Sequence, residues 1–199
     1  MTKRIIGLTG GIATGKTTVA NYLATTYKLP ILDADIYARD AVAVGSPILQ
    51  AIAQKYGQQI LLADGSLNRP KLGEIIFNQP EERSYVESLI HPYVRACFLE
   101  QIQNSSAKTL VLVVPLLFEA GVTNFVTEVW VVYCDHQQQL TRLIQRNQLN
   151  IEKAEARINS QMPLAEKVAR ADVVLDNNLN LEELYTQVDR ALLSGKVGN

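Results

Sequence analysis

The chain has 199 residues, a formal net charge of −1 and 47% hydrophobic residues. This length suits one α/β domain with insertions, and the near-neutral charge excludes a general attraction to nucleic acid or to a membrane surface. The longest apolar stretch, Leu110 to Phe118, is too short to cross a bilayer, and the N-terminus does not read as a signal peptide. We therefore expect a cytoplasmic protein without nucleic-acid or membrane partners. Its two cysteines, Cys97 and Cys134, are expected to be buried thiols.

Five short runs rich in apolar residues predict β-strands. Most of them are continuously apolar rather than alternating, which is typical of parallel strands covered on both faces. Helix-length segments separate the runs, so the sequence predicts an α/β fold with a five-stranded parallel sheet flanked by helices. The predicted strands are Arg4–Leu8, Pro30–Leu32, Thr109–Val114, Glu128–Tyr133 and Asp172–Leu175.

The segment from Gly10 to Thr17 matches the complete phosphate-loop pattern G-x-x-x-x-G-K-[ST], between a predicted strand and a predicted helix. Glycines allow the tight turn, and the helix N-terminus adds partial positive charge for phosphates. We expect Lys16 to reach the β- and γ-phosphates and the Thr17 hydroxyl to be a ligand of Mg²⁺. The predicted nucleotide-binding residues are Gly10, Gly11, Ile12, Ala13, Thr14, Gly15, Lys16, Thr17 and Thr18.

Two acidic residues, Asp33 and Asp35, follow the second predicted strand. Ligands of open α/β sheets bind beyond the carboxyl ends of the strands, so either carboxylate could orient or deprotonate an acceptor hydroxyl. The other could hold Mg²⁺ or the acceptor. Alternatively, Asp35 could cap a helix predicted over Ile36–Ala43. The sequence does not decide between the two acids.

The first long gap between strands, from about residue 36 to residue 108, predicts an inserted helical lobe. Its helix-like segments are Ser46–Tyr56 and Glu81–Gln103, with a turn at Ala63–Ser66. His91 precedes Pro92 in the second of these segments, where a helix break is the simpler interpretation and a ligand role the alternative.

The second gap, from about residue 137 to residue 170, carries six basic and three acidic residues. This excess predicts a helical lid over phosphates, and the alternative is an exposed helix pair with salt bridges. Arg142 and Arg146 are four residues apart and share one helix face, and Arg142 is a candidate to stabilise charge on the transferred phosphoryl group. The basic residues are Arg142, Arg146, Lys153, Arg157, Lys167 and Arg170.

The apolar run Leu110–Val114 looks like the strand of a Walker B element, although no aspartate ends it. Pro115 to Glu119 follow instead. Glu119 could serve near the metal or the acceptor, or could simply begin a helix.

These motifs, taken in order, resemble those of bacterial dephospho-CoA kinases, and the resemblance covers nearly the whole chain. One departure is Ala13-Thr14, where many members have Gly-Ser and where alanine is less free at positive φ. The matching motifs are Leu8–Ile12 with Gly15–Thr17, Asp33–Asp35 with Arg39, Leu67–Arg69 with Leu72 and Phe77, Ile90–Pro92, Pro115–Glu119, Arg142 with Arg146, Arg157 with Gln161, and Ala171–Asp172 running to Asn177.

The resemblance implies a phosphate-loop kinase core at about 1–35, 105–136 and 171–199, a helical acceptor-binding lobe at about 36–104 and a lid at about 137–170, all within one domain. It implies transfer of a phosphoryl group from ATP, with Mg²⁺, to the ribose 3′-hydroxyl of dephospho-CoA. Asp33 would be the base, and Lys16 and Arg142 would neutralise phosphoryl charge. The implied acceptor contacts are Asp35, Arg39, His91, Leu117 and Glu119.

Two other classes of protein are weaker alternatives. A shikimate or nucleoside kinase shares the Asp-x-Asp pattern after the second strand. A GTPase-type switch would carry Asn-Lys-x-Asp and Asp-x-x-Gly motifs, and the chain has neither. We expect a monomer or a weak homo-oligomer, with a frayed end at Lys196–Asn199.

Overall fold

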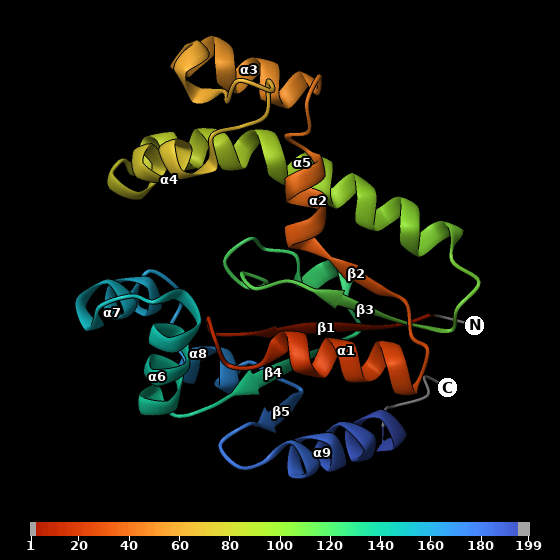
Figure 1. Ribbon diagram of the computed structural model, residues 1–199. Helices are drawn as coiled ribbons and strands as arrows, with labels where there is room; N and C mark the ends of the chain where they lie inside the picture. Colours follow the sequence, from red (N-terminus) through yellow and green to blue (C-terminus); the bar gives the residue numbers. More distant parts are fainter. Residues whose placement is uncertain (1–2, 195–199) are drawn as a thin grey trace. The chain divides into compact units, whose positions relative to one another are not determined.

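The computed structural model describes residues 3–194, except for the side chain at position 78, so the end predicted to fray lies outside the described residues. Along the described part of the chain, one or more helices or a short 3₁₀ turn separate successive strands, and Figure 1 shows these elements in ribbon form. The strands are β1 (Arg4–Gly10), β2 (Ile31–Asp33), β3 (Thr109–Val113), β4 (Glu128–Tyr133) and β5 (Val173–Asp176). The helices are α1 (Lys16–Thr26), α2 (Ala34–Asp40), α3 (Pro47–Tyr56), α4 (Arg69–Asn78), α5 (Pro80–Asn104), α6 (His136–Asn147), α7 (Ile151–Asn159), α8 (Leu164–Ala169) and α9 (Leu181–Ser194), with short 3₁₀ turns η1 (Gln58–Ile60) and η2 (Thr123–Phe125).

The five strands form one sheet in the order β2-β3-β1-β4-β5. β1 pairs in parallel with β3 on one side and with β4 on the other, and β4 pairs in parallel with β5. The predicted α/β fold with a five-stranded parallel sheet is therefore confirmed. β1 is central, so the loop that follows it leaves the middle of the sheet, where ligands of such folds bind.

The predicted strands match the observed ones to within two residues. β1 extends to Gly10 because Gly10 pairs with Val132 of β4. β2 includes Asp33, which the sequence placed just after the strand.

The chain divides into two compact units. One contains residues up to 32 and from 106 onwards, and the other contains residues 33–105. In the first unit, α1 and α9 cover the same face of the sheet, and their apolar side chains join those of the strands in one core. The core includes Ile6, Leu23, Trp130, Leu184 and Val188.

The second unit is helical and has a core of its own, which includes Leu49, Ile52, Leu72 and Val86. Local sequence signals define its helices. The Ser46 hydroxyl accepts a hydrogen bond from the Leu49 N–H at the start of α3 and so caps that helix. The predicted turn at Ala63–Ser66 is also present, with Asp64 Oδ1 accepting a hydrogen bond from the Ser66 N–H.

The predicted helix break at His91-Pro92 is wrong. α5 runs without interruption through Pro92. A proline inside a helix removes one backbone hydrogen bond, but Val86 on one side of Pro92 and Val94 and Phe98 on the other are buried. This burial on both sides of the proline stabilises the continuous helix.

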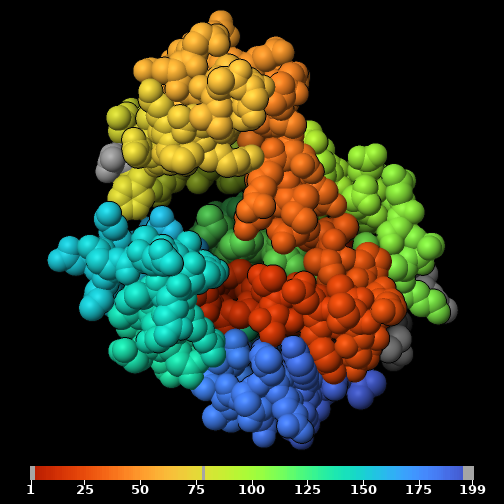
Figure 2. All heavy atoms as spheres, in the orientation of Figure 1, coloured from red at the N-terminus to blue at the C-terminus, as the bar shows by residue number. Residues whose placement is uncertain are grey.

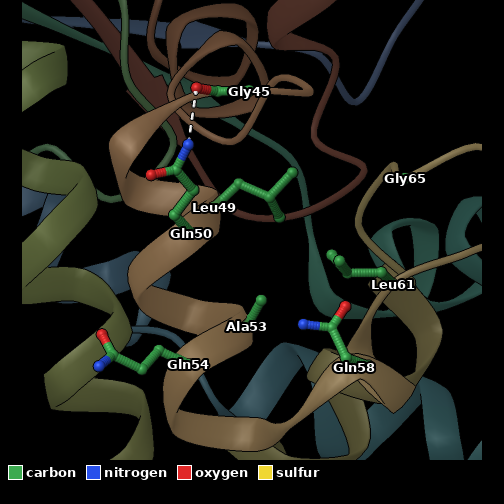
Figure 3. Close-up of a pocket in the computed structure, with 8 residues that line it drawn as sticks. All are labelled: Gly45, Leu49, Gln50, Ala53, Gln54, Gln58, Leu61 and Gly65. Atoms are coloured by element: carbon green, nitrogen blue, oxygen red, sulfur yellow. Dashed lines mark hydrogen bonds between the residues drawn. The ribbon is translucent and has the colours of Figure 1, made fainter.

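A cavity of about 400 Å³ lies in the second unit, beside α3 (Figure 3). Leu49, Ala53 and Leu61 supply apolar side chains, and Gln50 turns its amide toward the carbonyl oxygen of Gly45. None of the lining residues is charged. The cavity therefore lacks the groups that phosphoryl transfer requires.

Candidate active site

The phosphate loop connects β1 to α1 and lies in the first unit. Its backbone enters the left-handed region at Ala13, where φ is 61°, and at Gly15, where φ is 109°. Alanine adopts this conformation at a cost of about 1 kcal/mol, which glycine avoids. The departure from the common Gly-Ser pattern therefore does not prevent the loop from turning.

Lys16 and Thr17 begin α1. The Lys16 ammonium donates hydrogen bonds to the carbonyl oxygens of Gly10, at 3.2 Å, and Gly11, at 2.7 Å. The Thr17 side chain is exposed. Both groups are thus on the loop side of the helix N-terminus, where partial positive charge favours an anion.

Three side-chain amides from distant parts of the chain hold the phosphate loop. Gln139 of α6 donates to the Ile12 carbonyl oxygen at 2.8 Å, and Gln161 accepts a hydrogen bond from the Ile12 N–H at 2.9 Å. Asn177, directly after β5, donates to the Thr14 carbonyl oxygen at 2.8 Å. Figure 2 shows the turquoise atoms of α6 beside the red atoms of the first strand and loop.

Sequence reasoning assigned no role to these three amides. A signal for Gln139 was present, because it lies four residues before Leu143, which is fully buried on the same helix face. A glutamine on the buried face of a helix needs a hydrogen-bond partner for its side-chain amide, and the Ile12 carbonyl oxygen of the loop is that partner.

The segment predicted to be a lid is helical and consists of α6, α7 and α8, and it is called the lid segment below. Arg142 and Arg146 both lie on α6. Arg142 is half-buried and donates from Nη2 to the Asn177 carbonyl oxygen at 2.9 Å, whereas Arg146 is exposed. Burial raises the pKa of the neighbouring Cys134 thiol, while the Arg142 charge acts in the opposite direction. Cys134 is buried as predicted, but Cys97 is only half-buried.

Lys167 does not belong to the positive face of the lid. Its side chain is fully buried, its Nζ lies 2.8 Å from Glu119 Oε1, and it donates to the Pro115 carbonyl oxygen at 3.0 Å. Glu119 also accepts a hydrogen bond from the Met162 N–H at 3.1 Å. No helix begins at Glu119, so that alternative is wrong, and the ion pair instead joins the lid to the segment after β3.

The two acids after β2 differ in their contacts. Asp33 is the N-cap of α2 and accepts a hydrogen bond from the Asp35 N–H at 2.8 Å. The alternative in which Asp35 is the cap is therefore wrong, because α2 begins at Ala34, earlier than predicted. Asp35 lies exposed in the first turn, where its charge is favourable.

The other predicted acceptor contacts lie in both units. Arg39 on α2 is exposed and His91 on α5 is half-buried, and these two helices pack against each other in the second unit. Leu117, in the first unit, has no exposed surface. The acceptor contact at Leu117 therefore stays a prediction.

The described residues contain no group of three histidine, cysteine, aspartate or glutamate side chains that could hold a metal ion. Mg²⁺ in kinases is held largely by substrate phosphates with one or two protein ligands, and an exposed Thr17 hydroxyl next to the loop fits that donor set. Within residues 3–194, no helix combines the length and the apolarity needed to span a membrane.

Comparisons with known proteins agree with this geometry. The family model described as dephospho-CoA kinase matches residues 4–183. The chain belongs to the dephospho-CoA kinase family. It is 68% identical to the dephospho-CoA kinase of Trichormus variabilis, with 96% of this chain and 98% of that protein covered.

Two solved structures extend the agreement to the fold of the family. The crystal structure of TT1252 from Thermus thermophilus has a TM-score of 0.85 at 32% identity and covers 100% of both chains. The dephospho-CoA kinase from Campylobacter jejuni has a TM-score of 0.72 at 29% identity and covers 96% of each chain. The α/β fold predicted from the sequence is therefore the fold of the dephospho-CoA kinase family.

Proposed function

We propose that the chain transfers the γ-phosphoryl group of ATP to the ribose 3′-hydroxyl of dephospho-CoA, giving ADP and CoA. The observation that carries the proposal is a complete phosphate loop, held in its turned conformation, in a chain of the dephospho-CoA kinase family. The new bond joins the 3′-oxygen to the γ-phosphorus, and the bond between that phosphorus and the oxygen bridging to the β-phosphate breaks.

In this proposal, Asp33 accepts the proton of the 3′-hydroxyl. Its Oδ1 is engaged by the Asp35 N–H, which fixes the carboxylate and leaves Oδ2 as the oxygen for the acceptor. A positioned base contributes about 10²–10⁴ in rate, and less where the transition state is loose.

Lys16 and Arg142 neutralise the charge on the phosphoryl group as it moves. The loop N–H groups and the N-terminus of α1 bind the phosphates. Thr17 and the phosphates would hold Mg²⁺, which would supply positive charge to offset that of the phosphates. Asp35, Arg39, His91 and Glu119 are the acceptor contacts of the proposal. They come from α2, α5 and the segment after β3.

Two further statements belong to the proposal. The enzyme works in the cytoplasm, and it is a monomer or a weak homo-oligomer.

The test is ADP release from ATP and Mg²⁺ with dephospho-CoA, adenosine, shikimate or no acceptor. We expect turnover with dephospho-CoA alone, and a loss of about 10²–10⁴ in kcat for Asp33→Asn. Asparagine caps a helix about as well as aspartate, so this variant removes the base and leaves α2 intact. Equal ADP release in all four reactions, or full activity of Asp33→Asn, would contradict the proposal.

A further inference from the structure

Two of the amides that hold the phosphate loop are themselves buried. Gln139 has 3% of its surface exposed and Asn177 has 6%. Gln139 donates to the Ile12 carbonyl oxygen and Asn177 to the Thr14 carbonyl oxygen, each at 2.8 Å. Both donors therefore bind backbone oxygens of the loop, at alternate residues, in surroundings where water does not compete.

These contacts fix the direction of the neighbouring N–H groups. The described peptide bonds are all trans, and in a planar trans peptide the C=O of one residue and the N–H of the next point in opposite directions. Holding the Ile12 oxygen toward Gln139 turns the Ala13 N–H away from it. Holding the Thr14 oxygen toward Asn177 does the same for Gly15.

Ala13 and Gly15 also have positive φ, at 61° and 109°. Successive N–H groups in turns of this kind form the concave sites that bind anions. A carbonyl oxygen that rotated into such a site would present negative charge to a phosphate. The buried amides prevent that rotation by keeping both oxygens on the outside of the loop.

The glycine at position 11 is explained by the same contact. Gly11 is not among the described residues with positive φ, so its backbone would accept alanine. A Cβ atom there would, however, lie 2.4 Å from Gln139 Nε2. The close approach of Gln139 is thus what excludes a side chain at this position of the motif.

Gly15 has two reasons to be glycine. Its φ is 109°, and a Cβ atom would lie 2.2 Å from Asn177 Nδ2. A substitution there would mix backbone strain with the clash. A Cβ atom at Gly11 would also lie 3.2 Å from Thr14 Cγ2, but the Gly11–Gln139 pair is free of backbone strain, so it is the better pair for an experiment.

We propose that Gln139 and Asn177 are positioning residues for ATP, which orient the Ala13 and Gly15 N–H groups by binding the carbonyl oxygens of Ile12 and Thr14. The proposal rests on the nucleotide-binding part of the proposed function. It adds two side chains, from α6 and from the segment after β5, to the machinery that binds the phosphates.

The test is a double-mutant cycle of Gly11→Ala and Gln139→Ala, read as the Kd for ATP by calorimetry. Each single variant is expected to weaken ATP binding about tenfold, because each separates the amide from the Ile12 oxygen. The double variant is expected to bind no more than about threefold worse than Gln139→Ala, since the alanine at position 11 then has no amide to displace. Additive losses, about a hundredfold together, would overturn the proposal.

A second pair of variants separates positioning from folding. Gln139→Glu keeps the size of the side chain but turns a donor toward Ile12 into an acceptor, so we expect ATP affinity to fall more than for the exposed control Gln137→Glu. The KM for dephospho-CoA is expected to stay the same. Equal ATP affinity of the two variants, or loss of melting temperature with unchanged Kd, would show a structural role only. Because calorimetry needs no acceptor, a wild-type protein that binds ATP but fails to phosphorylate dephospho-CoA would contradict the proposed function and leave this inference standing.

Discussion

The phosphate loop and the acidic segment after β2 are organised in different ways. The loop is held by side chains from far along the chain, since Gln139 lies 127 residues from Ile12 and Asn177 lies 163 residues from Thr14. Asp33 is fixed by the N–H of Asp35, only two residues away. The first arrangement depends on the assembled sheet and lid, whereas the second is formed by the first turn of one helix.

This difference separates the consequences of mutation. Removal of a side chain that belongs to the loop leaves the hydrogen bonds from Gln139, Gln161 and Asn177 to the loop in place. A side chain that caps a helix performs a structural and a chemical task at once. The following predictions use that distinction, from the largest expected effect to the smallest.

Replacement of Lys16 with methionine should have a large effect on activity and little effect on stability. The loop is held by other residues, so we expect kcat to fall by about 10²–10³ with little change in melting temperature. Lys108 is an exposed lysine just before β3, so Lys108→Met is the matched control for the lost charge, and this variant should retain wild-type activity. A large drop in melting temperature for Lys16→Met would mean that its bonds to Gly10 and Gly11 shape the loop after all.

Removal of the Glu119 charge tests the contact between the lid and the segment after β3. Glu119→Gln leaves the fully buried Lys167 ammonium without its counter-ion, and we expect the free energy of unfolding to fall by about 3 kcal/mol. Urea denaturation measures this loss. Glu166→Gln, an exposed acid in the first turn of α8, should cost less than about 1 kcal/mol.

A further variant decides whether the buried charge is the cause. Glu119→Gln combined with Lys167→Met removes both charges and should regain much of the lost stability. No recovery in the double variant would mean that Glu119 acts through its bond to the Met162 N–H instead.

The smallest effect on stability concerns the cap at Asp33. Asp33→Ala should lower the free energy of unfolding by about 1 kcal/mol, and Asp33→Asn by much less, because asparagine retains the cap. Both variants should lose activity to a similar extent. Equal destabilisation by the two substitutions, measured by thermal denaturation, would show that the charge of Asp33 and not its cap stabilises α2.

The sequence was sufficient for features that depend on local pattern. Apolar runs predicted the strands to within two residues, and the motif predicted the loop between β1 and α1. The continuous helix through Pro92 could not be predicted in this way, because its stability comes from the burial of Val86 and Phe98 by other helices. A local rule for proline fails where tertiary packing offsets its cost.

The same limit applies to the candidate site. The sequence identified Lys167 only as one of six basic residues in the lid, and its burial against Glu119 depends on contacts between distant segments. Gln139 follows two other glutamines, and neither of those is buried. Gln139 differs from them only in lying on the same face of α6 as the buried Leu143. Its hydrogen-bond partner, the Ile12 carbonyl oxygen, is distant in the sequence and lies beside α6 only in the folded chain.

The position of β1 at the centre of the sheet also sets an order of events during synthesis. β1 and the phosphate loop are made before the partners of β1, because β3 and β4 follow about a hundred residues later along the chain. Asn177 is made later still. A segment that leaves the ribosome before its long-range partners therefore reaches its final shape only after β3, β4 and Asn177 have been made.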